Sequence, residues 1–537
     1  MLKNKSYVYG RSDRYVLATL HFGEYLLKKI WQNKDVVALI NGATDEKLFY
    51  GEIAQDAMNL AVSLVRLGVK KGDVIALSSE NRREYWSSVI GCICAGTTVT
   101  TINLTYTKDE LKHVMNIGKP KYLICSPYAY KAHEKSYRSL GYLKKIIVYG
   151  AEKHRATIPY SDLTVPNATD AKWGLTENIK YDDFLPVEVN GYDTVFLLYS
   201  SGTTGLPKGV MLSHISILTC CSPTDEAPPL VSLVITPWYH TMGLVTCMIN
   251  FCRGRTSVYL QKFEVELYMK TIEKYKIEVL GVVPPILVAL CKSNLQYDTS
   301  SVMLVTCGAA PLYEETAEAV KKRFPSVMAV LQGYGMTEST LILTFNDNTE
   351  KIGSVGTVME HVVLKVVHPE TREVLGPNKE GEICAKGVPM MKGYLGKDRK
   401  EDFDDEGFFR TGDMGYYDEE GCFYIVDRLK ELIKYKGYQV PPAEIEAVLL
   451  KHPGIRDAGV VGIPDTAAGE LPAAFVVLQP GAALTEQDIK NYVAENLSNP
   501  KHLRGGVRFL NEIPKNPSGK ILRRELRKLV KSNKSKL

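Results

Sequence analysis

Short apolar runs recur along the first two-thirds of the chain and alternate with segments of helical periodicity. The clearest runs cover residues 74–77, 122–125, 145–148 and 195–198. Continuous apolar runs between helices are typical of strands that are buried on both faces of a parallel sheet. The pattern therefore predicts an α/β architecture with parallel-rich sheets.

The pattern changes between residues 352 and 424, where short strand-like segments are separated by many glycines, as at residues 381–385. We expect a β-rich subdomain there. A further compact α/β unit follows Arg428. In it, Pro441-Pro442 precedes a helix that places Ile445, Val448 and Leu449 on one face.

A second helix of this unit is marked by Thr485 and Asp488, which form a plausible capping pair. About a hundred residues are enough for a separate small domain. We therefore predict a large N-terminal domain over residues 1–429 and a small, mobile C-terminal α+β domain over residues 430–537. The boundary lies near Leu429-Lys430, in a charged stretch.

Composition supports this description and excludes several classes of protein. The 537 residues are 45% hydrophobic and 24% charged, which is typical of globular chains and argues against disorder, collagen and coiled coil. Eleven cysteines without a CxxC pattern, and the absence of HExxH, favour reduced thiols over disulfides or a zinc site. The net charge of +5 is too small to indicate a nucleic-acid binder.

The positive charge is concentrated at the C-terminus. From Lys515 onward nine basic residues accompany one acidic residue, so this tail carries +8 and the rest carries −3.

The termini bear on location. The start of the chain has no apolar signal-peptide core, and the apolar run at residues 279–291 is too short to span a bilayer and contains Pro284-Pro285. We expect no membrane span. The chain ends in Ser535-Lys536-Leu537, the tripeptide that the peroxisomal import receptor reads. This ending predicts a peroxisomal protein of a eukaryote.

The strongest chemical signal is a loop that directly follows the apolar run at residues 195–198. It reads Tyr-Ser-Ser-Gly-Thr-Thr-Gly-Leu-Pro-Lys-Gly over residues 199–209. Small residues let backbone N–H groups approach an anion, hydroxyl groups add donors, and a lysine adds charge. The loop is not a P-loop, because Lys208 is followed by Gly209 and no GK[ST] occurs. The segment therefore predicts phosphate binding.

This loop resembles the signature loop of the adenylate-forming superfamily, which includes acyl-CoA synthetases, 4-coumarate-CoA ligases and firefly-type luciferases. Further motifs of that family follow in the expected order. Residues 333–338 (GYGMTE) resemble its second core motif, and residues 410–413 (RTGD) resemble its ribose-binding element. Residues 427–430 (DRLK) resemble the hinge, and residues 434–438 (KYKGY) resemble the element after it. Residues 517–520 (PSGK) resemble the C-terminal catalytic loop.

The resemblance implies ATP, Mg²⁺ and coenzyme A as reactants and assigns the phosphate-binding residues. Thr337 would contact the α-phosphate and Glu338 would coordinate Mg²⁺, although a carboxylate at that position could also be a simple helix-start residue. The leaving phosphates would be held by the signature loop, through Ser200, Ser201, Gly202, Thr203, Thr204, Gly205 and Lys208.

By the same resemblance, Tyr334, flanked by Gly333 and Gly335, would stack on adenine. Asp413 would accept hydrogen bonds from the ribose hydroxyls with help from Arg428, although an Asp in a Thr-Gly-Asp sequence is often only a turn former. The other side of the adenine slot would be the backbone of Gly308, Ala309, Ala310 and Pro311.

The resemblance also implies a two-step mechanism. Lys520 would contact the carboxylate and the α-phosphate during adenylate formation. The small domain would then rotate about Lys430, withdraw Lys520 and present the segment with Lys434, Lys436 and Gly437 for thioester formation with CoA.

The acid is the least determined element. His240 and Met242 would border the acyl pocket together with Leu341 and Ile342, at which firefly-type luciferases usually carry serine and alanine. Bulky aliphatic groups favour a medium- or long-chain fatty acid, so we expect a fatty acyl-CoA synthetase. An aryl-CoA ligase of the 4-coumarate type, a luciferase-type oxygenase and a non-catalytic binding relative remain alternatives.

Overall fold

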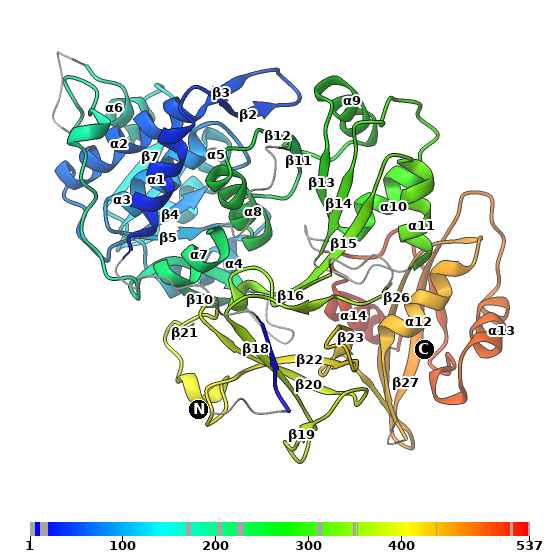
Figure 1. Ribbon diagram of the computed structural model, residues 1–537. Coiled ribbons are helices and arrows are strands. Elements are labelled where there is room, and N and C mark those ends of the chain that lie inside the picture. Colours follow the sequence, from blue (N-terminus) through cyan, green and yellow to red (C-terminus); the bar gives the residue numbers. More distant parts are fainter. Residues whose placement is uncertain are drawn as a thin grey trace.

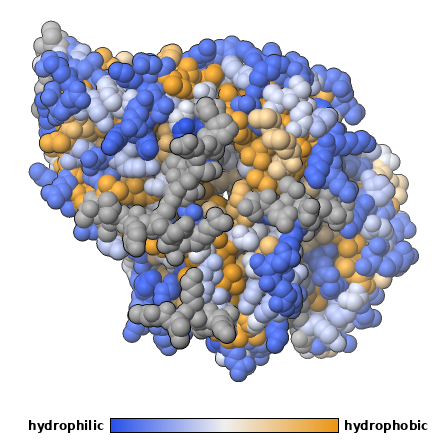
Figure 2. Space-filling model, viewed as in Figure 1, coloured by the Kyte–Doolittle hydropathy of each residue, from blue (hydrophilic) through white to orange (hydrophobic). Residues whose placement is uncertain are grey.

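The computed structural model describes residues 6–10, 20–167, 173–200, 207–222, 230–308, 314–346, 351, 353–436, 438–515 and 519–534. Its strands form four sheets, three in a large N-terminal domain and one in a small C-terminal domain (Figure 1). On the face that Figure 2 shows, hydrophilic residues predominate at the margins and apolar residues gather in patches between them. Among the described residues, no helix combines the length and apolar character that crossing a bilayer requires.

The first sheet has the strand order β21-β10-β9-β5-β4-β6-β7-β8. From β9 to β8 neighbouring strands are parallel, whereas β10 and β21 add antiparallel strands at one edge. The four apolar runs noted in the sequence are all strands of this sheet, which confirms that prediction. The strands are β4 (Val74–Ser78), β5 (Thr98–Thr101), β6 (Tyr122–Cys125), β7 (Lys145–Val148), β8 (Ile158–Pro159), β9 (Thr194–Ser200), β10 (Lys208–Ser213) and β21 (Gly393–Tyr394).

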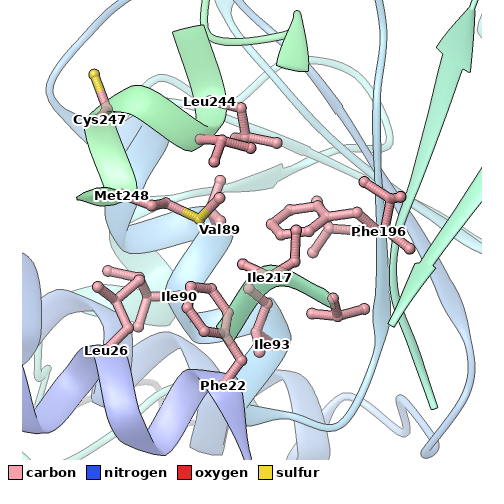
Figure 3. Close-up of a cluster of buried hydrophobic side chains, with 14 of the residues drawn as sticks. Phe22, Leu26, Val89, Ile90, Ile93, Phe196, Ile217, Leu244, Cys247 and Met248 are labelled. Atoms are coloured by element: carbon pink, nitrogen blue, oxygen red, sulfur yellow. The ribbon is translucent and has the colours of Figure 1, made fainter. Parts of the chain in front are cut away.

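Helices cover both faces of this sheet. Successive strand residues point to opposite faces, so a continuous apolar run makes both faces apolar. In β6, Ile124 joins the main apolar core, whereas Leu123 joins a separate cluster on the other face. The main core contains residues of α1 (Phe22–Gln32), α2 (Tyr50–Arg66), α3 (Glu84–Cys94), α7 (His214–Cys221) and α8 (Thr241–Cys252), several of which meet in Figure 3. The opposite cluster contains residues of α4 (Lys108–Gly118) and α5 (Pro127–Arg138), and the short α6 is Ser161–Thr164.

The second sheet has the order β17-β16-β15-β14-β13-β11-β12-β2-β3, and its strands from β15 to β2 are parallel. A second apolar cluster joins it to α9 (Val265–Tyr275), α10 (Pro284–Lys292) and α11 (Glu314–Arg323). The strands are β2 (Val37–Asn41), β3 (Lys47–Phe49), β11 (Ser232–Val234), β12 (Ser257–Tyr259), β13 (Val279–Val282), β14 (Leu304–Cys307), β15 (Ala329–Tyr334), β16 (Thr344–Asn346) and β17 (Thr357–Val358).

The third sheet is antiparallel, with the order β1-β18-β20-β22-β23 and β19 paired with β18. It confirms the β-rich segment that the glycine-rich texture predicts, and it also takes in a strand from the start of the chain. The strands are β1 (Val8–Tyr9), β18 (Val362–Val367), β19 (Val374–Leu375), β20 (Gly381–Gly387), β22 (Phe409–Tyr417) and β23 (Phe423–Arg428).

The small domain has its own sheet, in the order β25-β24-β27-β26 with β28 beside β27. One apolar cluster packs α12 (Pro442–Lys451) and α13 (Glu486–Asn496) against one face, and another packs α14 (Arg523–Lys534) against the other. The helix starts predicted at Pro441-Pro442 and at Thr485 are confirmed, the latter with its capping box. The strands are β24 (Ile433–Tyr435), β25 (Tyr438–Val440), β26 (Ile455–Asp465), β27 (Gly469–Leu478) and β28 (Val507–Phe509).

Candidate active site

The candidate site lies at the carboxyl ends of the parallel strands of the second sheet. Gly308 directly follows β14, and Tyr334 ends the neighbouring β15. A Cβ atom placed on Gly308 would lie 3.8 Å from the Gly333 carbonyl oxygen and 3.9 Å from Met242 Cε. Gly308 and Gly333, which are predicted to bind the nucleotide, and Met242, which is predicted to border the acyl pocket, are therefore neighbours. Carboxyl ends of parallel strands are where open α/β sheets bind ligands.

A tight turn after β15 folds the second motif back on itself. A Cβ atom on Gly335 would lie 2.0 Å from the Leu341 carbonyl oxygen, so this position requires glycine. Residues Thr337–Ser339 form a 3₁₀ turn, and Thr340 follows with a φ of 67°. The turn also brings Ile342 Cγ2 to 3.3 Å from where a Cβ of Gly333 would lie. The predicted pocket residues Leu341 and Ile342 therefore contact the nucleotide motif itself.

Tyr334, Asp413 and Arg428 form a hydrogen-bonded cluster. The Tyr334 hydroxyl donates to Asp413 Oδ2 at 2.8 Å, and Arg428 Nε lies 3.1 Å from Asp413 Oδ1. Asp413 and Arg428 are paired across β22 and β23, which fixes their spacing. Burial and the Asp413 carboxylate raise the pKa of the Tyr334 phenol well above its usual range. The phenol is therefore a donor at neutral pH, and Asp413 keeps further lone pairs for other donors.

A second cluster surrounds Glu338. Tyr394 donates a 2.6 Å hydrogen bond to Glu338 Oε1, and its ring centroid lies 4.3 Å from Lys208 Nζ. Lys208 Nζ also lies 3.5 Å from Asp402 Oδ1. The pairing of β10 with β21 carries Tyr394 to this place, because Val210 lies opposite it in register. The two residues predicted for phosphate and metal binding are therefore joined by one tyrosine.

Sequence reasoning did not identify Tyr394. It lies 56 residues from Glu338 in a two-residue strand, so no local motif or periodicity marks it. The one sequence signal is a Gly-Tyr pair inside the β-rich stretch, and nothing in that pair separates a core tyrosine from one at a site.

Glu338 suits a metal that arrives with a phosphate ligand. Its carboxylate is buried, and Tyr394 occupies one lone pair of Oε1. In the described part of the chain, no three His, Cys, Asp or Glu side chains are grouped so as to hold a metal ion by themselves. Mg²⁺ usually binds through one or two carboxylates together with substrate phosphates. The donor set therefore fits Mg²⁺ carried by a nucleotide.

The start of α8 carries His240 and contacts Thr337 through the next residue, Thr241. His240 is the N-cap residue, and Thr241 Oγ1 hydrogen-bonds Thr337 Oγ1 at 3.2 Å. Burial lowers the pKa of His240 to about 4, so the imidazole is neutral at neutral pH. Its Nε2 atom is buried and has no hydrogen-bond partner among the described residues. A buried ring nitrogen without a partner is costly unless a ligand satisfies it.

Lys520 belongs to the small domain but lies near the cluster around Asp413. Burial, and then the positive charge of Arg428, lower its pKa to about 8, whereas Asp413 acts in the opposite direction. Charges on the large domain therefore act on the lysine of the C-terminal loop. Two members of this loop motif, Pro517 and Ser518, lie outside the described residues.

The residues predicted for the hinge and the second step lie elsewhere on the small domain. Lys430, Lys434 and Lys436 are exposed. The backbone N–H of Lys434 donates to Glu470 Oε2, and that of Lys436 donates to the Ala468 carbonyl oxygen. Within the described ranges, the three lysines share no hydrogen bond or ion pair with the clusters around Asp413 and Glu338. The structure does not bring them into the site.

Several predicted residues fall outside the described part of the chain. The ends of the signature loop are described, because Ser200 and Lys208 lie opposite each other where β9 and β10 pair. The residues outside are Ser201, Gly202, Thr203, Thr204, Gly205, Ala309, Ala310, Pro311, Gly437 and the C-terminal Ser535, Lys536 and Leu537.

Known proteins resemble this chain in sequence and in fold. Residues 28–395 match the AMP-binding enzyme family, and residues 444–520 match the AMP-binding enzyme C-terminal domain. Luciferin 4-monooxygenase of Photuris pensylvanica is 38% identical over 552 residues, with 100% of both chains covered. 4-Coumarate–CoA ligase CCL1 of Humulus lupulus is 38% identical over 539 residues, covering 96% of this chain and 95% of the ligase. ATP-bound MatB from Rhodopseudomonas palustris is similar in structure, with a TM-score of 0.83, 28% identity and coverage of 95% of this chain and 99% of MatB.

The family match covers parts of both domains and includes the strand and turn that position Tyr334 and Glu338, whereas Asp413 lies between the two matched ranges. The fold prediction of a large α/β domain with a small C-terminal domain is confirmed. The protein is an enzyme of the acid–CoA ligase or luciferase-like kind. The chain belongs to the AMP-binding enzyme family, which is part of the adenylate-forming superfamily.

Proposed function

We propose that the protein is an ATP-dependent fatty acyl-CoA ligase. The observation that carries this choice is the aliphatic pair Leu341 and Ile342, whose turn packs against Gly333 and Gly335 beside the nucleotide cluster. Met242 lies next to Gly308 at the same edge of the sheet. An acid bound beside the nucleotide would meet apolar side chains, and burying a CH₂ group against them contributes about 0.8 kcal/mol.

In the first half-reaction, a carboxylate oxygen of the acid attacks the α-phosphorus of ATP. An O–P bond forms, the bond between the α-phosphorus and the bridging oxygen to the β-phosphate breaks, and pyrophosphate leaves with the bonding electron pair. Negative charge grows on the phosphoryl oxygens, so fixed cations and donors stabilise the transition state. Lys520 is the cation for the carboxylate and α-phosphate, Thr337 donates to the α-phosphate, and Lys208 meets the leaving phosphates.

Glu338 would hold Mg²⁺ that arrives with ATP, and the ion would supply neutralising charge at the phosphates. The nucleoside is bound by the cluster around Asp413. Tyr334 stacks on adenine, while Asp413 accepts hydrogen bonds from the ribose hydroxyls. Arg428, 3.1 Å from Asp413, keeps this carboxylate oriented.

In the second half-reaction, the CoA sulfur attacks the acyl carbon of the adenylate. A C–S bond forms, the bond from this carbon to the AMP oxygen breaks, AMP leaves, and the thiol proton passes to solvent. Residues 1–429 stay fixed while residues 430–537 rotate about Lys430. The rotation withdraws Lys520 and presents Lys434 and Lys436 to the reaction site. One small domain thereby serves both steps.

His240 sits between the nucleotide cluster and the acid. Because burial keeps the imidazole neutral, the ring lines an apolar pocket without adding charge. Its Nε2 atom is positioned to accept or donate one hydrogen bond when the adenylate is bound.

A luciferase-type oxygenase is a second candidate, because luciferin 4-monooxygenase is as similar in sequence as 4-coumarate–CoA ligase. The two can be separated with purified protein, ATP, Mg²⁺ and CoA. The acids to compare are medium- and long-chain fatty acids, hydroxycinnamic acids and firefly luciferin. Acyl-CoA is measured by mass spectrometry and light by photon counting. We expect acyl-CoA from fatty acids; light from luciferin with no fatty acyl-CoA would reject the proposal, and hydroxycinnamoyl-CoA alone would favour the aryl ligase.

The matched variant is Leu341→Ser combined with Ile342→Ala. It introduces the residues usual in firefly-type luciferases without touching the charged clusters. We expect kcat/KM for fatty acids to fall at least tenfold relative to hydroxycinnamic acids, since two aliphatic side chains lose contact with the substrate. An unchanged ratio would show that these residues do not line the acid pocket.

We also propose that the protein is imported into peroxisomes through Ser535-Lys536-Leu537. A fluorescent protein fused to the N-terminus should colocalise with a peroxisomal marker. Removal of Leu537 should leave the fusion in the cytosol, and unchanged colocalisation would reject the signal.

A further inference from the structure

Helix α12 of the small domain begins without a cap of its own. Its N-cap residue is Pro441, whose side chain cannot accept a hydrogen bond. The cap comes instead from Asp427, because Asp427 Oδ2 accepts a 3.0 Å hydrogen bond from the backbone N–H of Ala443. Asp427 belongs to β23 of the third sheet, in the large domain, and α12 packs against that strand. A helix of the small domain is thus capped by a residue of the large domain.

The environment of Asp427 suits this role. The side chain is only 8% exposed, and Oδ1 accepts a second hydrogen bond, of 2.6 Å, from the N–H of Arg428. Burial raises the pKa of Asp427, while the charge of Arg523 and the two N–H donors oppose that rise. A carboxylate at a helix N-terminus also interacts favourably with the helix dipole. The contact is therefore a specific, buried one between the two domains.

A chain of contacts leads from this cap to Lys520. On α12, Glu446 accepts two 2.9 Å hydrogen bonds from Arg523 Nη2. Both side chains are buried, at 7% and 10% exposure. Arg523 is the first residue of α14 and lies three residues after Lys520. A contact that holds the start of α12 in place therefore also holds the loop that carries Lys520.

We propose that Asp427 is a positioning residue that holds the small domain in the orientation for adenylate formation. Capping α12 across the hinge keeps Lys520 beside Asp413 and Arg428, and the bond to Ala443 breaks when the small domain rotates about Lys430. This proposal rests on the two-step function proposed above. Loss of the cap removes stabilisation from the first orientation alone, so the balance moves toward the second.

The two half-reactions test the proposal in opposite directions. In Asp427→Ala, we expect adenylate formation, measured by pyrophosphate exchange, to fall about tenfold, the size typical of a lost helix cap. Thioester formation from supplied acyl-adenylate and CoA should stay constant or rise. Asp427→Asn keeps an amide oxygen for the N–H donors, so adenylate formation should fall less in this variant than in Asp427→Ala. A merely structural role would lower both rates together.

The matched control is Asp488→Ala. Asp488 also accepts a backbone N–H, that of Thr485, and it does so at the start of α13 within the small domain. Its loss should cost comparable stability without changing the ratio of the two half-reactions. An equal change of that ratio in the Asp427 and Asp488 variants would overturn the proposal.

A distance measurement tests the same proposal without catalysis. Spin labels attached through a non-natural amino acid at exposed Glu152 and Glu495 report the spacing between the domains by pulsed EPR. We expect Asp427→Ala to shift the distance distribution and Asp488→Ala to leave it as in the unaltered protein. An unshifted distribution in Asp427→Ala would overturn the proposal even in an active ligase. A shifted one would support it even if the protein made no acyl-CoA.

Discussion

The pH dependence of adenylate formation tests the role proposed for Lys520. Burial and Arg428 lower the pKa of this lysine to about 8. Such a lysine is about 90% protonated at pH 7 and about 10% protonated at pH 9. Because the reaction needs the ammonium form, kcat/KM for ATP in pyrophosphate exchange should fall about tenfold over this interval. This constant reports the free enzyme, to which the pKa applies.

Bound ATP changes the expected profile in a defined direction. The triphosphate favours the charged lysine, so the descending limb of kcat should lie at higher pH than that of kcat/KM. Thioester formation from supplied acyl-adenylate should lack this limb, because Lys520 has then left the site. The three profiles together distinguish the lysine from other groups that titrate near pH 8.

Two substitutions sharpen the assay. Lys520→Arg carries a charge at every accessible pH, so its remaining adenylation activity should lose the limb near pH 8. Lys520→Ala should lower adenylate formation by a factor of about 10² to 10³, the range for a group that stabilises developing charge, and should spare the second half-reaction. Lys528→Ala is the control, because Lys528 is an exposed lysine of the same segment that pairs with Glu525. A flat wild-type profile from pH 7 to 9, or equal loss of both half-reactions in Lys520→Ala, would refute the reasoning.

Three further predictions concern stability and the Glu338 turn. The pKa of Lys520 is lower in the folded protein than in the unfolded chain, so its charge destabilises the fold below about pH 8 by up to roughly 3 kcal/mol. Lys520→Met should therefore raise the urea midpoint at pH 7, and the gain should vanish above about pH 10.5. Tyr394→Phe removes the 2.6 Å hydrogen bond to Glu338 but keeps the ring beneath the lysine, so the Mg²⁺ concentration for half-maximal pyrophosphate exchange should rise about threefold to tenfold. Gly335→Ala places Cβ 2.0 Å from the Leu341 carbonyl oxygen, so adenylate formation should fall by more than tenfold, and wild-type exchange rates would contradict the close approach.

Local patterns in the sequence predict the elements of this fold well. The apolar run at residues 195–198 is the centre of β9, and the Pro441-Pro442 pair does precede a helix. Thr485 and Asp488 form the capping box expected from their spacing. Each of these features depends on residues within a few positions of one another. Hydrophobic periodicity and capping chemistry are local, so one sequence is sufficient to recognise them.

Contacts between distant segments could not be predicted in this way. Tyr394 reaches Glu338 only because β21 pairs with β10, and β1 joins β18 across more than 350 residues. Both β21 and β1 have two residues, which is too short for any periodicity. The resemblance to a family supplies the order of motifs, but it does not say which other side chains pack around them. The tyrosine at Glu338 is visible only in three dimensions.

The charge of the C-terminal segment shows the same division between sequence and structure. Counted along the sequence, the +8 of this tail could describe a basic surface for a polyanion. In the fold, several of its cations face carboxylates instead. Arg523 pairs with Glu446, Arg527 with Glu431, and the other pairs are Lys515 with Asp457 and Lys528 with Glu525. The pairs of Arg523 and Arg527 attach α14 to α12 and to the segment after the hinge. Part of the positive charge therefore helps to orient the loop that carries Lys520. Neutralising Arg523 or Arg527 should change the ratio of the two half-reactions more than the affinity for any polyanion, whereas neutralising Lys528, which pairs within α14, should not change that ratio.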